Sequence, residues 1–85
     1  DNDVRHIMED DFGCLWLGTR RGIVCIDKKE LSDFAKGRIE KINSILYDES
    51  DGIKSPWCEN GTKTRDGRLW FTTDKGVVVI DPSEI

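Results

Sequence analysis

The side chains that could carry chemistry are few, and they lack the partners that each reaction needs. Asp11-Phe12-Gly13 spells the metal-binding triplet of protein kinases, but the glycine-rich loop, the strand lysine and the catalytic-loop aspartate do not accompany it. The segment 48–52, DESDG, is acidic enough to attract calcium, yet it lacks the ligand spacing and the terminal glutamate of a calcium loop. We therefore interpret both segments as solvated turns.

Histidine and cysteine chemistry is limited in the same way. His6 is the single histidine, and no cysteines are spaced with it as in a zinc site. The three cysteines cannot all pair within one chain. We expect Cys25 to be a small buried hydrophobic residue, whereas Cys14 or Cys58 could be exposed and cross-link two chains. The sequence thus predicts no catalytic residue, no metal site and no cofactor.

The strongest pattern in the sequence is a repeat. Residues 13–31, GCLWLGTRRGIVCIDKKEL, align without a gap with residues 67–85, GRLWFTTDKGVVVIDPSEI, which lie 54 positions later. Nine positions are identical, among them Trp16/Trp70. A fixed spacing of this size is typical of stacked supersecondary units.

Each unit has the pattern of a β-hairpin. Two short apolar runs, 15–17 and 23–26 in the first copy, flank two polar residues and a glycine. Glycine adopts the positive φ that the end of such a turn needs. The runs do not alternate between apolar and polar residues, so both faces of each strand should be covered. Small sheets packed face to face, as in the blades of a β-propeller, would produce this pattern.

The remaining segments complete the unit. Val4 to Glu9 predicts a strand before the first hairpin and Ile42 to Tyr47 a strand after it, while Trp57 to Thr64 leads into the second hairpin. Between the third and fourth strands, Asp27 can cap a short helix whose apolar face holds Leu31, Phe34 and Ala35, and Gly37 can end it.

The sequence therefore predicts an all-β fold of antiparallel four-stranded propeller blades. Residues 1–54 would form a complete first blade with a short helix over 28–36, and residues 55–85 would form an incomplete second blade. A propeller needs roughly four to eight blades to close. We accordingly expect the chain to be a fragment of a larger protein, and the isolated fragment to self-associate.

The residues that carry this pattern also carry a family resemblance. Ile7 to Asp27 reads I-x-E-D-x-x-G-x-L-W-L-G-T-x-x-G-I-x-x-I-D, which resembles the two-component regulator propeller repeat. Residues 28–82 resemble that family's final blades, although Thr72 replaces the glycine expected before Thr73. The resemblance implies a sensor region outside the cytoplasm in a bacterial membrane receptor, followed by a small β-sandwich and coupled to a histidine kinase. Some relatives drive a diguanylate cyclase instead.

In such a propeller the tryptophans would have different positions. Trp16 and Trp70 are expected to fill the gaps between adjacent blades. Trp57 precedes an inner strand, where loops face the central opening. Trp57, Glu59 and Asn60 are therefore the candidate contacts for a small-molecule or carbohydrate ligand.

Composition narrows the alternatives. The net charge is −4 with both signs interspersed, so no basic stripe is available for nucleic acid. No apolar run approaches the ~20 residues that span a bilayer. Two other classes stay open: a protein-binding propeller without signalling output, and a propeller enzyme such as a polysaccharide lyase, against which the shortage of histidine counts.

Overall fold

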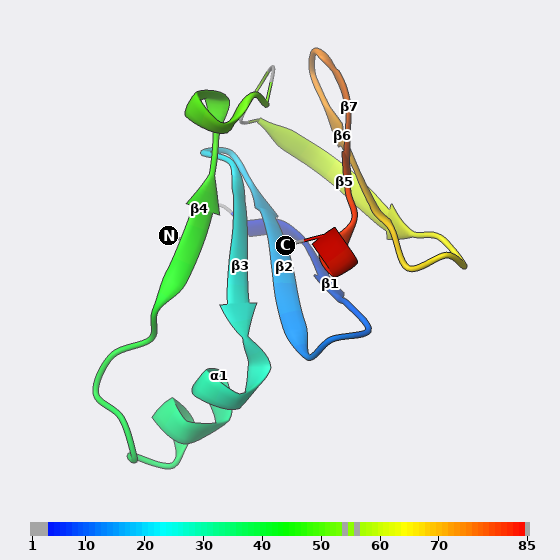
Figure 1. Ribbon diagram of the computed structural model, residues 1–85. Coiled ribbons are helices and arrows are strands. Elements are labelled where there is room, and N and C mark those ends of the chain that lie inside the picture. The colour runs from blue at the N-terminus through cyan, green and yellow to red at the C-terminus, as the bar shows by residue number, and fades with distance from the viewer. Residues whose placement is uncertain (1–3, 54, 56, 85) are drawn as a thin grey trace.

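The computed structural model describes residues 4–53, 55 and 57–84 and contains two antiparallel sheets (Figure 1). The first has the order β1-β2-β3-β4 and the second the order β5-β6-β7. The strands are β1 Val4–Glu9, β2 Cys14–Thr19, β3 Ile23–Asp27, β4 Ser44–Tyr47, β5 Cys58–Lys63, β6 Leu69–Thr73 and β7 Gly76–Ile80. The predicted all-β fold and the order of its strands are confirmed. The division into units at residues 54 and 55 stays a prediction.

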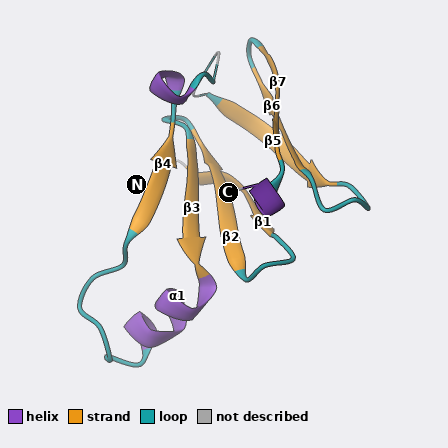
Figure 2. Ribbon diagram, in the orientation of Figure 1, coloured by secondary structure: helices purple, strands orange, loops and turns teal. Residues whose placement is uncertain are grey.

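One α-helix, α1 Lys28–Ala35, lies between β3 and β4, where the sequence predicts it (Figure 2). The side chain of Asp27 caps it by accepting a hydrogen bond of 2.8 Å from the backbone N–H of Lys29. No side chain of α1 is buried, and Phe34 is 47% exposed. The predicted apolar face of the helix is therefore uncovered by the described residues. The following strand begins at Ser44 and not at Ile42.

Short 3₁₀ helices follow both sheets, η1 Glu49–Asp51 after β4 and η2 Pro82–Glu84 after β7. Among the described residues, no helix has the length and apolar character that crossing a membrane requires.

The two sheets repeat one another in hydrogen-bond register as well as in sequence. Every residue pair between β1 and β2 has a counterpart between β5 and β6 at the same spacing, as in Met8↔Trp16 and Thr62↔Trp70. Both first strands also carry an irregularity in the same place, at Arg5 and at Glu59. The structural repeat therefore extends over first strands whose sequences share no identical residue.

The core lies between the two sheets, where β1 and β2 pack against β5. Trp16, Ile23, Leu69 and Phe71 are buried almost completely. The sheets pack closely at Gly18, where an added Cβ would lie 3.2 Å from the ring of Phe71 and would require that ring to shift slightly. Burial of these large side chains is the main stabilising contribution to such a sheet pair.

Trp16 meets the prediction that it fills the space between sheets, because it is only 1% exposed. Its ring stacks on Tyr47 with centroids 5.9 Å apart. Trp70 occupies the equivalent register position in the second sheet but is only half-buried among the described residues. The difference follows from position, since Trp16 faces the second sheet and Trp70 has no third sheet beside it in the part of the chain described.

Candidate ligand-binding site

Trp57, Glu59 and Asn60 lie together at the start of β5, and all three are exposed. The side-chain oxygen of Asn60 accepts a hydrogen bond of 2.8 Å from the backbone N–H of Gly61. The side chain of Asn60 is thus partly engaged in local structure. Glu59 occupies the irregular position of β5, where a bulge commonly re-aims a side chain.

Two arginines that the sequence did not single out converge on Trp57. The guanidinium carbon of Arg20 lies 4.7 Å from the centroid of the Trp57 ring, and that of Arg5 lies 5.9 Å from it. Both distances are within the range of a cation–π interaction. The indole and the two cations form a cluster, here called the Arg–Trp cluster, which consists of Arg5, Arg20 and Trp57.

The two arginines of this cluster come from two elements of the first sheet. Arg5 lies at the irregular position of β1, and Arg20 lies in the turn between β2 and β3. That turn is fixed by Thr19, whose hydroxyl donates to the carbonyl of Gly22 at 2.8 Å and accepts from the N–H of Arg21 at 3.0 Å. Arg20 is therefore presented by a turn of defined shape.

Trp57 is held from the other sheet. The buried hydroxyl of Ser55 accepts a hydrogen bond of 3.2 Å from the backbone N–H of Trp57 and donates to the carboxylate of Asp74. Asp74 belongs to the turn between β6 and β7. The cluster thus joins the first sheet, through its arginines, to the second sheet, through its indole.

The charges of the cluster are not neutralised within the described part of the chain. Neither Arg5 nor Arg20 has a carboxylate within ion-pair distance among the residues that the structure describes. This is notable in a chain with a net charge of −4. Among the described residues, the cluster therefore holds two arginines without a paired carboxylate.

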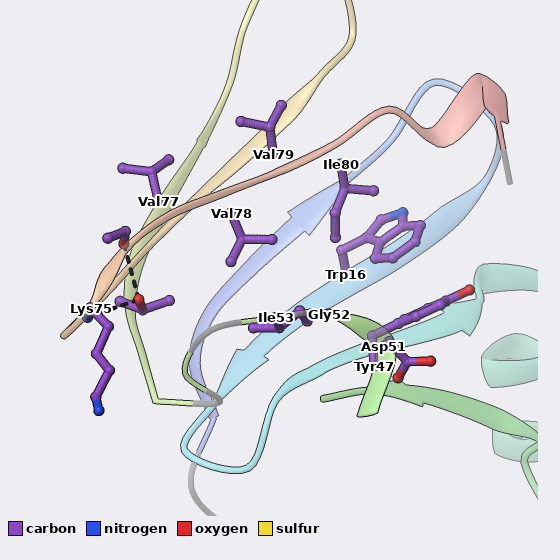
Figure 3. A pocket seen from close by; sticks show the side chains of 12 residues that line it. Trp16, Tyr47, Asp51, Gly52, Ile53, Lys75, Val77, Val78, Val79 and Ile80 are labelled. Carbon is purple, nitrogen blue, oxygen red and sulfur yellow. Dashed lines mark hydrogen bonds between the residues drawn. The ribbon is translucent and has the colours of Figure 1, made fainter. Parts of the chain in front are cut away.

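Apart from the Arg–Trp cluster, a mostly apolar cleft lies between the sheets (Figure 3). Its volume is about 440 Å³, and Trp16 and Tyr47 line one side of it. Figure 3 shows Val78 and Ile80 of β7 pointing into this cleft, whereas Val77 and Val79 point away from it. The cleft offers apolar contact but few polar groups to orient a ligand, so it is the weaker candidate site.

In the two segments that the sequence analysis compared with metal sites, residues 11–13 and 48–52, acidic side chains make hydrogen bonds within the chain. Asp11 accepts from the ammonium group of Lys63 at 2.9 Å, which links the two sheets at the surface. Asp48 accepts from the backbone N–H of Ser50 at 2.9 Å and forms a capping box with Asp51. Residues 11–13 form the predicted turn, whereas residues 48–52 hold the 3₁₀ helix η1 with its caps instead of a simple turn. In the described part of the chain, no group of three or more His, Cys, Asp or Glu side chains could hold a metal ion.

The cysteines differ from expectation at one position. All three are free. Cys25 is buried as predicted, and burial together with the neighbouring Cys14 raises its pKa to about 12. Cys58 is fully buried in the core, so the suggestion that it is exposed is wrong. Burial also raises the pKa of the Cys58 thiol. Cys14 is the accessible thiol, since it is only half-buried.

Comparison with known proteins agrees with this geometry. The two antiparallel sheets with the same register define the class as an all-β repeat protein. Residues 1–21, which contain β1, β2 and Arg20, match the family model described as two component regulator propeller. No curated protein and no solved structure matches the chain.

Proposed function

We propose that this chain is part of the ligand-sensing β-propeller of a bacterial two-component sensor histidine kinase, in the region outside the cytoplasm. The single observation that carries the proposal is the family match over residues 1–21. The structural repeat supports it, because a second sheet in the same register extends the repeat beyond the matched residues.

In this proposal each sheet is one propeller blade. β1 and β5 lie side by side as the inner strands, and Trp16 fills the space between the two blades. Trp70 would fill the next space in the same way, against a following blade. A β-sandwich after the propeller would pass the signal toward the membrane.

The activity of this segment is regulatory. A ligand that binds one arrangement of the receptor more tightly than another shifts the balance between them, by no more than its differential affinity. A site that joins two blades, as the Arg–Trp cluster does, is suited to this because its geometry depends on how the blades are arranged. Phosphoryl transfer would take place in a kinase domain elsewhere in the receptor.

The decisive experiment is to sequence the gene on both sides of the segment that encodes this chain. We expect further propeller repeats, a membrane-spanning segment and a histidine kinase domain in the same reading frame. A diguanylate cyclase in place of the kinase would overturn the kinase assignment and keep the sensor. A lyase gene, or a gene without any output domain, would overturn the proposed function.

We also propose that the isolated chain self-associates along β7. Among the described residues β7 pairs only with β6, while its counterpart β3 pairs on both sides. Val77 and Val79 on this strand are 58% and 44% exposed. An unpaired apolar edge is a template for strand addition. Sedimentation at rising concentration should show dimers or larger species, and a monomer throughout would refute the association.

A further inference from the structure

We propose that the Arg–Trp cluster binds the oxyanion, carboxylate or phosphate, of a small ligand. The inference rests on the proposed sensor function and names the ligand class of its site. It goes beyond the sequence, which pointed to Trp57, Glu59 and Asn60 but not to either arginine.

The guanidinium groups of Arg20 and Arg5 lie over the ring of Trp57. A guanidinium is planar, and its N–H donors lie in that plane. Packing one face of the group on an indole leaves the in-plane donors free for other partners. Arg20 has this opportunity, since its guanidinium carbon lies 4.7 Å from the centroid of Trp57. The free donors match the paired oxygens of a carboxylate or a phosphate.

Two cations share one aromatic ring. Arg5 and Arg20 lie within 5.9 Å of the same centroid, and like charges so placed repel each other. No carboxylate among the described residues pairs with either of them. An anion that contacts both groups would relieve this repulsion, which favours an anionic ligand over a neutral one.

The cluster is accessible from solvent. Trp57 is 38% exposed, and both arginines are exposed. A small ligand can therefore reach the donors without opening the core. Glu59, two residues from Trp57, is also exposed. Its carboxylate repels an anion held too close to β5. The same carboxylate can accept a hydrogen bond from a hydroxyl group of the ligand.

The cluster connects the two sheets, so a ligand bound there can influence how they are arranged. The arginines belong to the first sheet, and Trp57 is tied through Ser55 to the second. An oxyanion that fixes the arginines on Trp57 would favour one arrangement of the two sheets. The ligand would thus act on the contact between blades.

The test uses the 85-residue chain and three matched probes: glucuronate, glucose 6-phosphate and glucose. Affinity is measured by isotope-edited NMR through the indole N–H of Trp57 and the side-chain N–H signals of the arginines. We expect at least one anionic probe to bind about tenfold or more tightly than glucose, and the binding to weaken as salt is added. The carboxylate and phosphate arms tell which oxyanion is preferred.

Variants locate the site. Arg20→Gln and Arg5→Gln should each weaken binding of the preferred anion about tenfold, whereas Arg20→Lys should recover part of the loss. Arg65→Gln is the matched control, because Arg65 is exposed in the turn between β5 and β6 and no interaction places it near the cluster. It removes the same charge and should leave affinity unchanged. Urea unfolding of each variant shows whether the fold is intact.

Two results would overturn the inference. One is that neither anionic probe binds more tightly than glucose. The other is that Arg65→Gln weakens binding as much as Arg20→Gln, which would mean nonspecific attraction by positive charge. Failure here is distinguishable from failure of the sensor function, since the gene sequence decides the latter independently of any binding measurement.

Discussion

The carboxylate of Asp10 accepts a hydrogen bond of 2.8 Å from the indole nitrogen of Trp16, and both groups are buried. The same relationship recurs 54 residues later, where the hydroxyl of Thr64 accepts from the indole of Trp70 at 3.1 Å. Each acceptor precedes the turn that enters the second strand of its sheet. The repeat thus keeps the tryptophan and its partner's position, while the chemical type of the partner changes.

Asp10→Ala should destabilise the chain strongly. Asp10 also accepts from the backbone N–H groups of Phe12 at 2.8 Å and Cys14 at 2.9 Å, so one substitution removes three hydrogen bonds around a buried indole. We expect a loss of about 3 kcal/mol in the free energy of unfolding. Thr64→Ala is the control at the equivalent, exposed position and should cost about 0.5 kcal/mol. Urea denaturation measures both, and equal losses would contradict the structural difference between the two sheets.

Asp10 should also make stability depend on pH. Burial by itself would raise the pKa of Asp10, but hydrogen bonds from Trp16, Cys14 and Phe12 outweigh it and lower the pKa from the ordinary 3.8. A depressed folded-state pKa stabilises the fold above the unfolded pKa, and this contribution is lost as pH falls through the folded value. Asp10→Asn removes this titration. The difference in free energy of unfolding between the wild type and Asp10→Asn should therefore shrink from pH 6 to pH 2, and a constant difference would refute the assignment.

The hairpins could be predicted because their determinants are local. Gly22 and Gly76 end the two turns with φ of 139° and 133°, a region that residues with a Cβ rarely adopt. Two polar residues before a glycine, between apolar runs, were enough to place these turns. The capping of α1 by Asp27 was local in the same sense.

The Arg–Trp cluster could not be predicted, because it joins positions far apart in the chain. Nothing in the sequence around Arg5 or Arg20 shows that they meet Trp57. Both first strands were predicted, but their matching register was not. β1 and β5 share no identical residue that would align them. Burial of Cys58 was missed on the same ground, as it depends on packing between sheets.

The thiols should differ in reactivity. We expect iodoacetamide at pH 8 to modify Cys14 first, because it is only half-buried. Burial raises the pKa of the Cys25 thiol, so very little reactive thiolate forms there at this pH. Cys58 is fully buried as well, so both should react only as the chain unfolds. Mass spectrometry of digested samples reads the order, and early labelling of Cys58 would show that the two sheets separate readily.

A pair of glycine variants tests whether β7 lacks a paired strand on the side away from β6. Gly22→Ala and Gly76→Ala impose the same backbone strain, since the two φ values are nearly equal. An added Cβ at Gly22 would also collide with the carbonyl of Tyr47 on the neighbouring β4, whereas at Gly76 nothing lies within 4 Å. We expect a cost of about 1 kcal/mol for Gly76→Ala and at least about 3 kcal/mol for Gly22→Ala in dilute solution.

If a strand from a second copy pairs with β7 at high concentration, its backbone would take the place that Tyr47 takes beside Gly22. Gly76→Ala should then weaken self-association as well, so sedimentation of this variant should show more monomer than the wild type at the same concentration. Unchanged association in this variant would mean that the copies meet through another surface, and similar stability losses for both variants would show that β7 is already paired.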